Sequence, residues 1–248
     1  MKIKHIIFNI ESLSFKEALE YLVENAKKKE KKTFVATINP EIIILARSDP
    51  EYEKVLKLVD LALNDSIGVI WAGKMFGKKF KGRIHGVDLV DMLCKEISEK
   101  PITVGFLGGR ENVAQKTADR LSQKYPGLKV AFATEEANEP QTTDYGKTAL
   151  DGSQKAVSIK CDILFVAFGS PKQEKWIYNN LPKIDVRVAI GVGGAFDFLS
   201  GRVRRAPKFV RSLGLEWLFR LILQPWRAKR QIALIKFVFV VLKEKFSF

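Results

Sequence analysis

The sequence predicts an α/β protein with a Rossmann-like, mostly parallel β-sheet flanked by helices, followed by a C-terminal helical appendage. Short β-rich runs alternate with longer helical patterns as far as about Gly201, which is typical of parallel sheets. The 248 residues are 46% hydrophobic, enough to bury a sizeable core. Beyond Gly201 the period is helical without strand alternation. We therefore expect an α/β domain over residues 1–200 and an appendage over residues 201–248.

The individual elements follow from this periodicity. Seven runs have the length and apolar composition of strands: Ile3–Phe8, Thr33–Ile38, Ile67–Trp71, Thr103–Leu107, Lys129–Ala133, Ile163–Phe168 and Arg187–Gly191. Six stretches between them have helical periodicity: Phe15–Lys29, Glu41–Ala46, Glu51–Leu63, Val87–Glu99, Asn112–Tyr125 and Lys172–Asn180. The polar stretch Thr134–Lys155 predicts a loop with one short helix.

The positive charge is concentrated in the appendage. The formal net charge is +14 with a pI near 9.7, and residues 201–248 hold 12 Lys and Arg against two acidic residues, or +10 of the total. Such an excess predicts a polyanionic partner, which composition alone leaves open between nucleic acid, lipid head groups and a phosphorylated substrate. A nucleic-acid-binding protein would interleave basic and aromatic residues over its body. The remaining +4 offers little of this, so nucleic acid is not expected.

The appendage has the pattern of a basic amphipathic segment. Its first helix should end near Gln224, because Pro225 cannot donate a main-chain hydrogen bond. The longest late apolar run, Phe237–Leu242, is too short to span a bilayer, so any membrane contact should be peripheral. An ordinary buried C-terminal helix explains the amphipathicity equally well. The apolar and interface-seeking side chains are Phe209, Leu213, Trp217, Leu218, Leu221 and Trp226.

The cysteines and the first residues predict a cytoplasmic protein. Cys94 and Cys161 are too few for a disulfide framework or a zinc cluster and are expected to be buried thiols. The N-terminal apolar run is broken by Asn9 and Glu11 and lacks the cleavage pattern of a signal peptide.

Two strand-to-helix junctions contain polar residues suited to chemistry. In open α/β sheets ligands bind where strands end and helices begin. Thr37 and Asn39 lie in Thr-Ile-Asn-Pro-Glu, which local sequence explains well enough as a capped helix start with Pro40 at its first position. Asp65 precedes an apolar run, where a carboxylate can be tuned for proton abstraction; in isolation, a surface turn is the more common explanation.

Three further junctions are rich in glycine or in capping residues. Gly108-Gly109 would let a nucleotide approach the main chain closely, but no G-x-G-x-x-G fingerprint of a dinucleotide-dependent oxidoreductase is present. Ser170 and Gln173 match a capping box with Pro171 at the first helical position. The loop Gly193-Gly194 leads to a lone Asp197 and requires either a ligand or a tight turn.

Taken together, these segments resemble the WecG/TagA/CpsF family of glycosyltransferases. The matching text runs in order over nearly the whole chain: TINPE, ND followed by GVIWAG, GRIHGVDL, GFLGG, FGSPKQE, GVGGAFDFLSG, RRAP, GLEWLFRL, QPWR and Arg230. Two segments depart from the family pattern. Ser66 stands where the family commonly has glycine, and AFATEEANE replaces a more usual Gly-Tyr-Phe type of stretch.

The resemblance implies an activity, a fold and a set of partners. The activity would be an inverting transfer of N-acetylmannosamine from its UDP donor to GlcNAc-diphospho-undecaprenol, with a β-1,4 linkage, as in wall teichoic acid linkage-unit synthesis. A family member transferring N-acetylmannosaminuronic acid or another UDP-sugar, in enterobacterial common antigen, capsule or exopolysaccharide synthesis, is the alternative. The family has a type E glycosyltransferase fold, and its appendage docks on the anionic inner face of the cell membrane. The oligomeric state is left open, a homo-oligomer included.

The resemblance also assigns roles to residues. The aspartate matching Asp65 is the general base, and the residues matching Thr37, Asn39 and Gln173 line the pocket. The sequence contains no D-x-D metal motif, so we expect no metal and no cofactor. The negative charge of the departing UDP should then be met by arginines and by main-chain N–H groups. The candidates for this role are Arg83, Arg220, Arg227, Arg230 and the loops Gly108-Gly109 and Gly193-Gly194.

Overall fold

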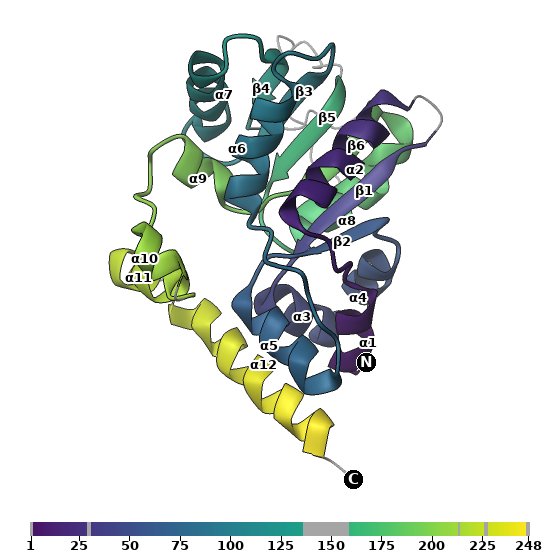
Figure 1. Cartoon of the computed structure of the whole chain (residues 1–248), viewed down its shortest axis with the longest axis vertical. Coiled ribbons are helices and arrows are strands. Elements are labelled where there is room, and N and C mark those ends of the chain that lie inside the picture. Colours follow the sequence, from purple (N-terminus) through teal and green to yellow (C-terminus); the bar gives the residue numbers. More distant parts are fainter. Residues whose placement is uncertain (1, 29–30, 136–158, 213, 226–227, 247–248) are drawn as a thin grey trace, which may run out of the picture.

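A six-stranded sheet organises the protein, in a computed structural model that describes residues 2–28, 31–135, 159–212, 214–225 and 228–246. The sheet order is β2-β1-β6-β5-β3-β4, and every pair of neighbours is parallel. The predicted α/β class with a parallel sheet is therefore confirmed (Figure 1). The strands are β1 (Thr33–Ile38), β2 (Leu61–Asn64), β3 (Thr103–Gly108), β4 (Lys129–Thr134), β5 (Lys160–Ala167) and β6 (Asp185–Gly191).

Helices cover both faces of the sheet, which is why its central strands read as continuous apolar runs. All six residues of β1 are buried. One face is covered by α2 (Phe15–Lys27), α6 (Gly86–Ile97), α7 (Val113–Lys124) and α9 (Ala195–Leu199). The other is covered by α1 (Ile3–Asn9), α3 (Pro40–Ser48), α4 (Pro50–Lys57), α5 (Ile67–Phe76), α8 (Lys172–Asn180) and α12 (Ala228–Phe246).

Two predicted strands are wrong, because both runs are helices. Ile3–Phe8 lies in α1, where Ile3, Ile7 and Ile10 have helical spacing and are fully buried. Ile67–Trp71 lies in α5, which begins where the Ser66 hydroxyl accepts a hydrogen bond from the Val69 N–H. A short run that is apolar all round fits a buried helix as well as a buried strand, and the packing of other helices around α5 selects the helix.

One helix boundary and one helix cap also differ from the prediction. The expected helix Glu51–Leu63 ends at Lys57 as α4, and Leu61–Asn64 is instead the edge strand β2. The expected capping box of α8 is wrong: Pro171 occupies the N-cap position without a side-chain cap, and the Ser170 hydroxyl donates to Glu174 at 2.8 Å. The Ser170 hydroxyl thus contacts the buried Glu174 carboxylate and does not cap the N-terminus of α8. The prediction for Thr134–Lys155 lies, beyond residue 135, outside the described residues.

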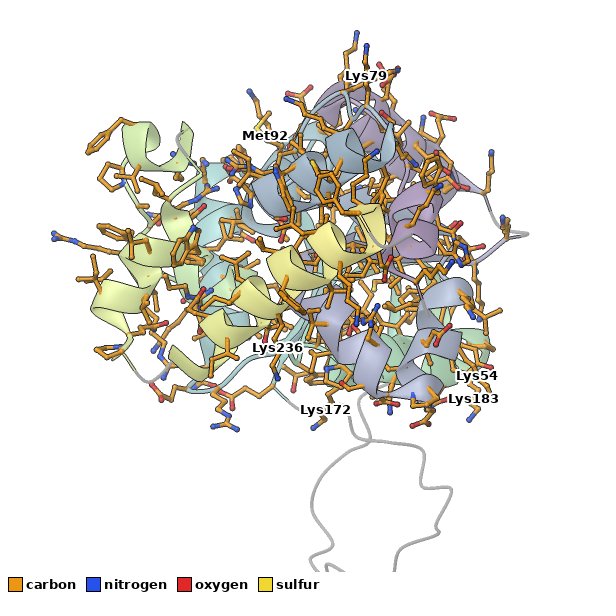
Figure 2. All side chains as sticks on the ribbon, turned by 90° about the horizontal axis from the view of Figure 1, so that it is seen from below. Lys54, Lys79, Met92, Lys172, Lys183 and Lys236 are labelled. Atoms are coloured by element: carbon orange, nitrogen blue, oxygen red, sulfur yellow. The ribbon has the colours of Figure 1, made fainter. Side chains whose placement is uncertain are left out.

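The C-terminal segment is helical, as predicted. After α9 the chain forms α10 (Lys208–Ser212) and α11 (Glu216–Leu223), and α11 ends at the expected place before Gln224. Helix α12 then returns across α3 and α5 (Figures 1 and 2). In the part of the chain that the structure describes, no helix has the length and apolarity to cross a bilayer.

Helix α12 is anchored in the body. Phe237 and Val241 are fully buried in the core cluster that contains α3 and α5. Glu244 accepts hydrogen bonds from the main-chain N–H groups of Ile3 and Lys4 at 2.9 and 3.2 Å, and it pairs with Arg47 at 2.7 Å. The last helix of the chain therefore shares a core with the first.

Candidate functional site

The predicted site residues gather along one edge of the sheet. Since all strands are parallel, the loops after β1, β2, β5 and β6 leave the sheet at the same edge. These loops and helix starts contain Asn39, Asp65, Gln173 and Gly193-Gly194. The helices after the neighbouring strands β1 and β6, α3 and α9, lie on opposite faces of the sheet, and ligands of open α/β sheets commonly bind at such a switch point.

Thr37 and Gln173 hold the loop after β6. The Thr37 hydroxyl donates to Gly191 O at 2.9 Å, and Gln173 Oε1 accepts from the Gly193 N–H at 2.9 Å. A Cβ added at Gly191 would lie 2.9 Å from Gln173 Nε2, so this close approach requires glycine. Both side chains are buried. The pair fixes the main chain of the Gly191–Gly194 loop at the centre of the edge.

A buried carboxyl group lies behind Gln173. Glu174 accepts hydrogen bonds from Gln173 Nε2 at 2.7 Å, from the Ser170 hydroxyl at 2.8 Å and from the Tyr52 hydroxyl at 3.0 Å. Burial raises the pKa of Glu174 above its ordinary value although these donors counteract it. Burial and the neighbouring carboxylate likewise raise the pKa of Tyr52. The cluster orients the Gln173 amide, with its oxygen toward Gly193.

Asp65 lies at the end of β2, and the structure joins it to the same loop cluster. Its main-chain N–H donates to Ile38 O at 3.0 Å. Its Oδ1 lies 2.8 Å from His85 Nδ1 and 3.3 Å from the Gly86 N–H. A Cβ added at Gly86 would lie 3.3 Å from Val192 O and 3.9 Å from the Thr37 hydroxyl. A single residue, Gly86, therefore lies in space between Asp65 and both Thr37 and the Gly191–Gly194 loop.

The neighbouring asparagine positions the segment that faces Asp65. Asn64 Nδ2 donates to Gly82 O at 2.9 Å, its Oδ1 accepts from the Ser66 N–H at 3.1 Å, and its main-chain oxygen accepts from the Ile84 N–H at 2.7 Å. These contacts hold the strand end beside residues 82–86. They bring His85 to the position from which it reaches Asp65.

The C-terminal segment contributes an arginine to the glycine loop. Arg220 Nη2 lies 3.3 Å from Asp197 Oδ2, and its guanidinium lies over the Phe198 ring at 4.6 Å. A Cβ added at Gly194 would lie 3.0 Å from the same guanidinium. Arg202 also pairs with Asp197, at 3.6 Å. Arg220, Asp197, Gly193 and Gly194 thus form one group.

A second arginine ties the C-terminal segment to α6. Both terminal nitrogens of Arg205 donate to the Asp88 carboxylate at 2.6 Å. Burial raises the pKa of Asp88, but the Arg205 hydrogen bonds outweigh it and leave that pKa below its ordinary value. Arg205 Nε lies 3.5 Å from Glu216 Oε1. This forked pair seats the segment beside the start of α6.

Some predicted site residues lie apart from this group. Gly108 ends β3, and the Gly109 N–H donates to Ala167 O at the end of β5 at 3.2 Å, but β3 is four strands from β2, or roughly 19 Å at about 4.8 Å per strand. Arg83 donates to Arg211 O at 3.0 Å and so supports the C-terminal segment. Arg227 and the Arg230 side chain lie outside the described residues, although α12 includes the Arg230 main chain.

Three side chains at the edge had no assigned role in the sequence analysis. His85, Glu174 and Glu216 each contact a predicted site residue or its partner. All three lie inside the motifs that carried the resemblance, GRIHGVDL, FGSPKQE and GLEWLFRL. The motifs were the available signal, but no spacing rule links His85 to Asp65, 20 positions away, or to Glu216, 131 positions away.

The candidate metal ligands of the described residues do not form a cluster. Among them, no three His, Cys, Asp or Glu side chains are grouped so as to hold a metal ion. Cys94 and Cys161 are buried free thiols, as predicted, and burial raises the pKa of each.

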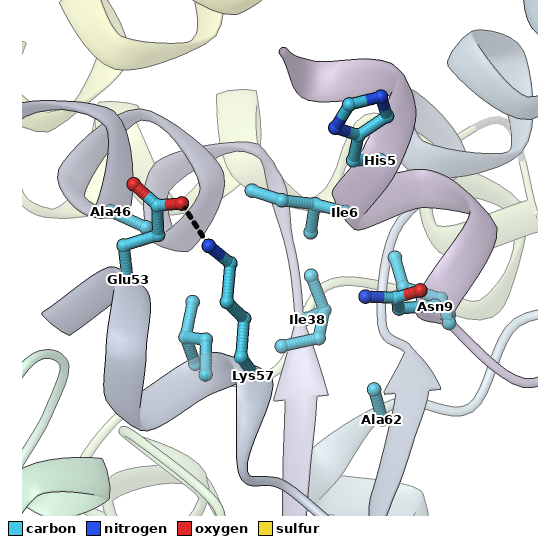
Figure 3. Close-up of a pocket in the computed structure, with 10 residues that line it drawn as sticks. His5, Ile6, Asn9, Ile38, Ala46, Glu53, Lys57 and Ala62 are labelled. Atoms are coloured by element: carbon cyan, nitrogen blue, oxygen red, sulfur yellow. Dashed lines mark ion pairs between the residues drawn. The ribbon is translucent and has the colours of Figure 1, made fainter. Parts of the chain in front are cut away.

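A small apolar pocket lies on the α1 side of the sheet, between α1 and α4 (Figure 3). Ile6, Ile38 and Ala62 line it, and Lys57 beside it pairs with Glu53 at 2.6 Å. None of the predicted site residues lines this pocket, and its only lysine is already paired with a carboxylate.

Comparison with known proteins identifies a family and several relatives of this chain. Residues 3–248 match the model of the glycosyl transferase WecG/TagA/CpsF family. The chain is 36% identical to a Bacillus spizizenii protein over 95% of this chain and 87% of the relative, and 32% identical to a Bacillus subtilis protein over 92% and 86%. A Staphylococcus aureus protein is 28% identical over 86% and 80%. All three are named N-acetylglucosaminyldiphosphoundecaprenol N-acetyl-beta-D-mannosaminyltransferase. The chain belongs to the WecG/TagA/CpsF family of glycosyltransferases.

Proposed function

We propose that this protein transfers N-acetylmannosamine from UDP-N-acetylmannosamine to GlcNAc-diphospho-undecaprenol with inversion, forming the β-1,4 disaccharide of the wall teichoic acid linkage unit. The names of three relatives that cover most of the chain support the substrates. The observation that carries the proposal is the junction of Asp65, through Gly86, with Thr37 and the Gly191–Gly194 loop. In the proposal this carboxylate acts together with the Gly191–Gly194 loop, to which Arg220 lies close at Gly194.

Asp65 acts as the general base in this proposal. Both hydrogen bonds to its side chain within the described residues go to Oδ1, so Oδ2 is the oxygen that meets the acceptor. The acceptor hydroxyl gives its proton to Oδ2, its oxygen bonds to the anomeric carbon, and the bond from that carbon to UDP breaks with its electron pair leaving on the β-phosphate. Base catalysis of this kind contributes about 100-fold or more.

The charge that UDP gains is met by cations of the chain. Arg220 at the Gly193-Gly194 loop is the described candidate, and Arg227 and Arg230 complete the set. Gln173, Thr37, Asn39 and Asp197 position the loops and the donor, and Gly108-Gly109 extends the donor site along the edge. Oxyanion stabilisation by fixed donors requires no metal, so addition of a chelator should leave the transfer rate unchanged.

The base assignment is tested by Asp65→Asn, with Asp119→Asn on the exposed face of α7 as the matched control. We expect Asp65→Asn to lower kcat about 100-fold or more while KM for the donor stays within about twofold. Asp119→Asn should behave as the wild type. Near-normal turnover of Asp65→Asn at saturating substrates would overturn the assignment.

The donor sugar is tested by mass spectrometry of the product. The assay offers a synthetic GlcNAc-diphospholipid together with UDP-N-acetylmannosamine, its uronic acid and UDP-glucuronic acid. We expect the N-acetylmannosamine adduct to predominate. A predominant uronic acid adduct would replace the main proposal with the enterobacterial-type alternative, and no adduct from any donor would reject the transferase function.

Docking on the inner face of the cell membrane belongs to the same proposal. Helix α12 presents a second apolar face, opposite to the buried Phe237 and Val241. The residues of this outer stripe are exposed and recur every three or four positions, as they do along one side of a helix: Ile232, Ile235, Phe239, Leu242 and Phe246. Lys236 and Lys243 flank this outer stripe by the same helical geometry, and Figure 2 labels Lys236 on α12. An apolar stripe flanked by lysines fits the head-group layer of an anionic membrane.

The double variant Ile235→Asn, Phe239→Asn tests the docking. Leu58→Asn, an exposed leucine after α4 and away from the outer stripe, is the control. We expect the double variant alone to lose sedimentation with phosphatidylglycerol vesicles. Unchanged sedimentation would reject the docking face, and a change from oligomer to monomer in vesicle-free solution would assign the stripe to a homo-oligomer instead. Deletion of residues 201–248 is a poorer test, since it also removes Phe237 from the core.

A further inference from the structure

His85 lies between two carboxylates from different parts of the chain. Its Nδ1 lies 2.8 Å from Asp65 Oδ1 at the end of β2, and its Nε2 lies 3.4 Å from Glu216 Oε2 at the start of α11. About a fifth or less of each of the three side chains is exposed: 21% for Asp65, 20% for His85 and 16% for Glu216. The line Asp65–His85–Glu216 therefore joins the sheet edge to the C-terminal segment.

The imidazole fixes one oxygen of Asp65. An ionised carboxylate has no proton to give, so His85 Nδ1 carries the hydrogen of the 2.8 Å contact. The Gly86 N–H donates to the same oxygen. Two donors on Oδ1 hold the carboxylate plane and leave Oδ2 for a substrate hydroxyl. His85 itself precedes α6 and makes no side-chain cap to it, so its ring has no helix-capping role.

The other ring nitrogen faces Glu216. Nε2 is shielded from solvent and makes no hydrogen bond within the described residues, which leaves the Glu216 carboxylate as its close polar neighbour. Glu216 is in turn 3.5 Å from Arg205, whose fork on Asp88 fixes it to α6. The position of Glu216 against His85 thus depends on the contact of Arg205 with Asp88.

We propose that His85 is a positioning residue that aligns Asp65, and that Glu216 makes this alignment depend on the seated C-terminal segment. The proposal rests on the function proposed above, in which Asp65 is the base. During transfer the acceptor proton goes to Asp65 Oδ2, and His85 keeps its own Nδ1 proton throughout. The consequence is that the base is aligned only in molecules whose C-terminal segment covers the site.

Three substitutions at residue 85 separate positioning from packing. In His85→Asn an amide nitrogen lies near the position of Nδ1, so a donor to Asp65 is kept. In His85→Gln the amide nitrogen lies near the position of Nε2 instead. His85→Ala has no side-chain donor. We expect His85→Ala and His85→Gln to lower kcat about tenfold or more, with KM for UDP-N-acetylmannosamine within about twofold. His85→Asn should recover kcat to within about threefold of the wild type. His5→Asn, at the exposed histidine of α1, is the control.

Glu216 is tested in a double-mutant cycle with the asparagine variant. Glu216→Gln should lower kcat about three- to tenfold when residue 85 is His and have little further effect when it is Asn, because no atom then faces residue 216. Circular dichroism and thermal unfolding confirm that each variant is folded.

Each outcome decides one part of the proposal. Unchanged kcat in His85→Ala, or equal loss in His85→Asn and His85→Ala, overturns the positioning role. An equal effect of Glu216→Gln in both backgrounds overturns the coupling to the C-terminal segment. Failure of the proposed function has a different signature, since the wild type would then form no adduct or Asp65→Asn would remain active.

Discussion

The Gln173 side chain accepts a hydrogen bond from the main-chain N–H of Gly193 at 2.9 Å and donates one to Glu174 at 2.7 Å. Its amide therefore joins the loop after β6 to a buried carboxyl group. Reversal of the amide would break both contacts, and a carboxylate in its place could still accept from Gly193 but would lose the donation to Glu174. This dependence makes Gln173 a sensitive position for both stability and transfer.

Gln173→Glu should destabilise the protein because it sets a second carboxylate against the buried Glu174. We expect a loss of about 2–4 kcal/mol in the free energy of unfolding at pH 8, measured by urea denaturation, and a large loss of transfer. Gln115→Glu is the matched control, since Gln115 donates to Asp119 in the same way on the exposed face of α7, and it should cost under about 0.5 kcal/mol. Equal losses in the two variants would contradict the prediction.

The raised pKa of Glu174 should give stability a specific pH dependence. Burial favours the protonated carboxyl, so this residue's contribution is greatest below the pKa of the unfolded chain and declines as pH rises through the higher folded pKa. Glu174→Gln removes this titration. The free energy of unfolding of the wild type minus that of Glu174→Gln should therefore fall between pH 4 and pH 8. A difference that rises with pH would show that the three donors outweigh burial.

Arg205→Lys should loosen the C-terminal segment, because an ammonium cannot reproduce the forked contact with Asp88. We expect a loss of about 1–2 kcal/mol at pH 7 and faster proteolysis within residues 201–216. Arg204→Lys at the exposed neighbour is the control. The lowered pKa of Asp88 means that the pair stabilises above the unfolded pKa and loses its effect as pH falls through the folded pKa. The difference from the wild type should accordingly shrink below about pH 4.

Phe237→Ala should destabilise the whole protein, because this α12 side chain lies fully buried in the body. The expected loss is about 3–5 kcal/mol in urea denaturation. Ile235→Ala on the same helix, where the side chain is 71% exposed, should change stability by less than about 0.5 kcal/mol. A separate unfolding transition for α12 alone would contradict the shared core.

Much of the fold was accessible from the sequence because local signals agreed with the packing. Asn39 caps α3 with Pro40 at its first position, as the Asn-Pro-Glu pattern predicts. The strands Thr33–Ile38 and Thr103–Gly108 match their apolar runs almost residue for residue. The failures occurred at Ile3–Phe8 and Ile67–Trp71, where short apolar runs fit both periods and only tertiary packing distinguishes them.

For the candidate site, the sequence indicated residues but not the contacts between their side chains. Thr37, Asp65 and Gln173 were predicted as site residues because motif resemblance points to residues that chemistry alone would leave ambiguous. The contacts that hold them, His85 with Asp65 and Glu174 with Gln173, depend on side-chain directions that no periodicity encodes. Gly108-Gly109 was grouped with the other loops although strand order sets it four strands from Asp65.

The shared core of α1 and α12 has a consequence for biosynthesis. Because α12 follows every other helix in the chain, the apolar surfaces of α1, α3 and α5 stay uncovered on the ribosome until translation reaches Phe237 and Val241. A nascent chain that stalls before this point exposes this apolar surface to chaperones and to other nascent chains. The core that these helices share with α12 can therefore form only after residues 237–241 have been synthesised.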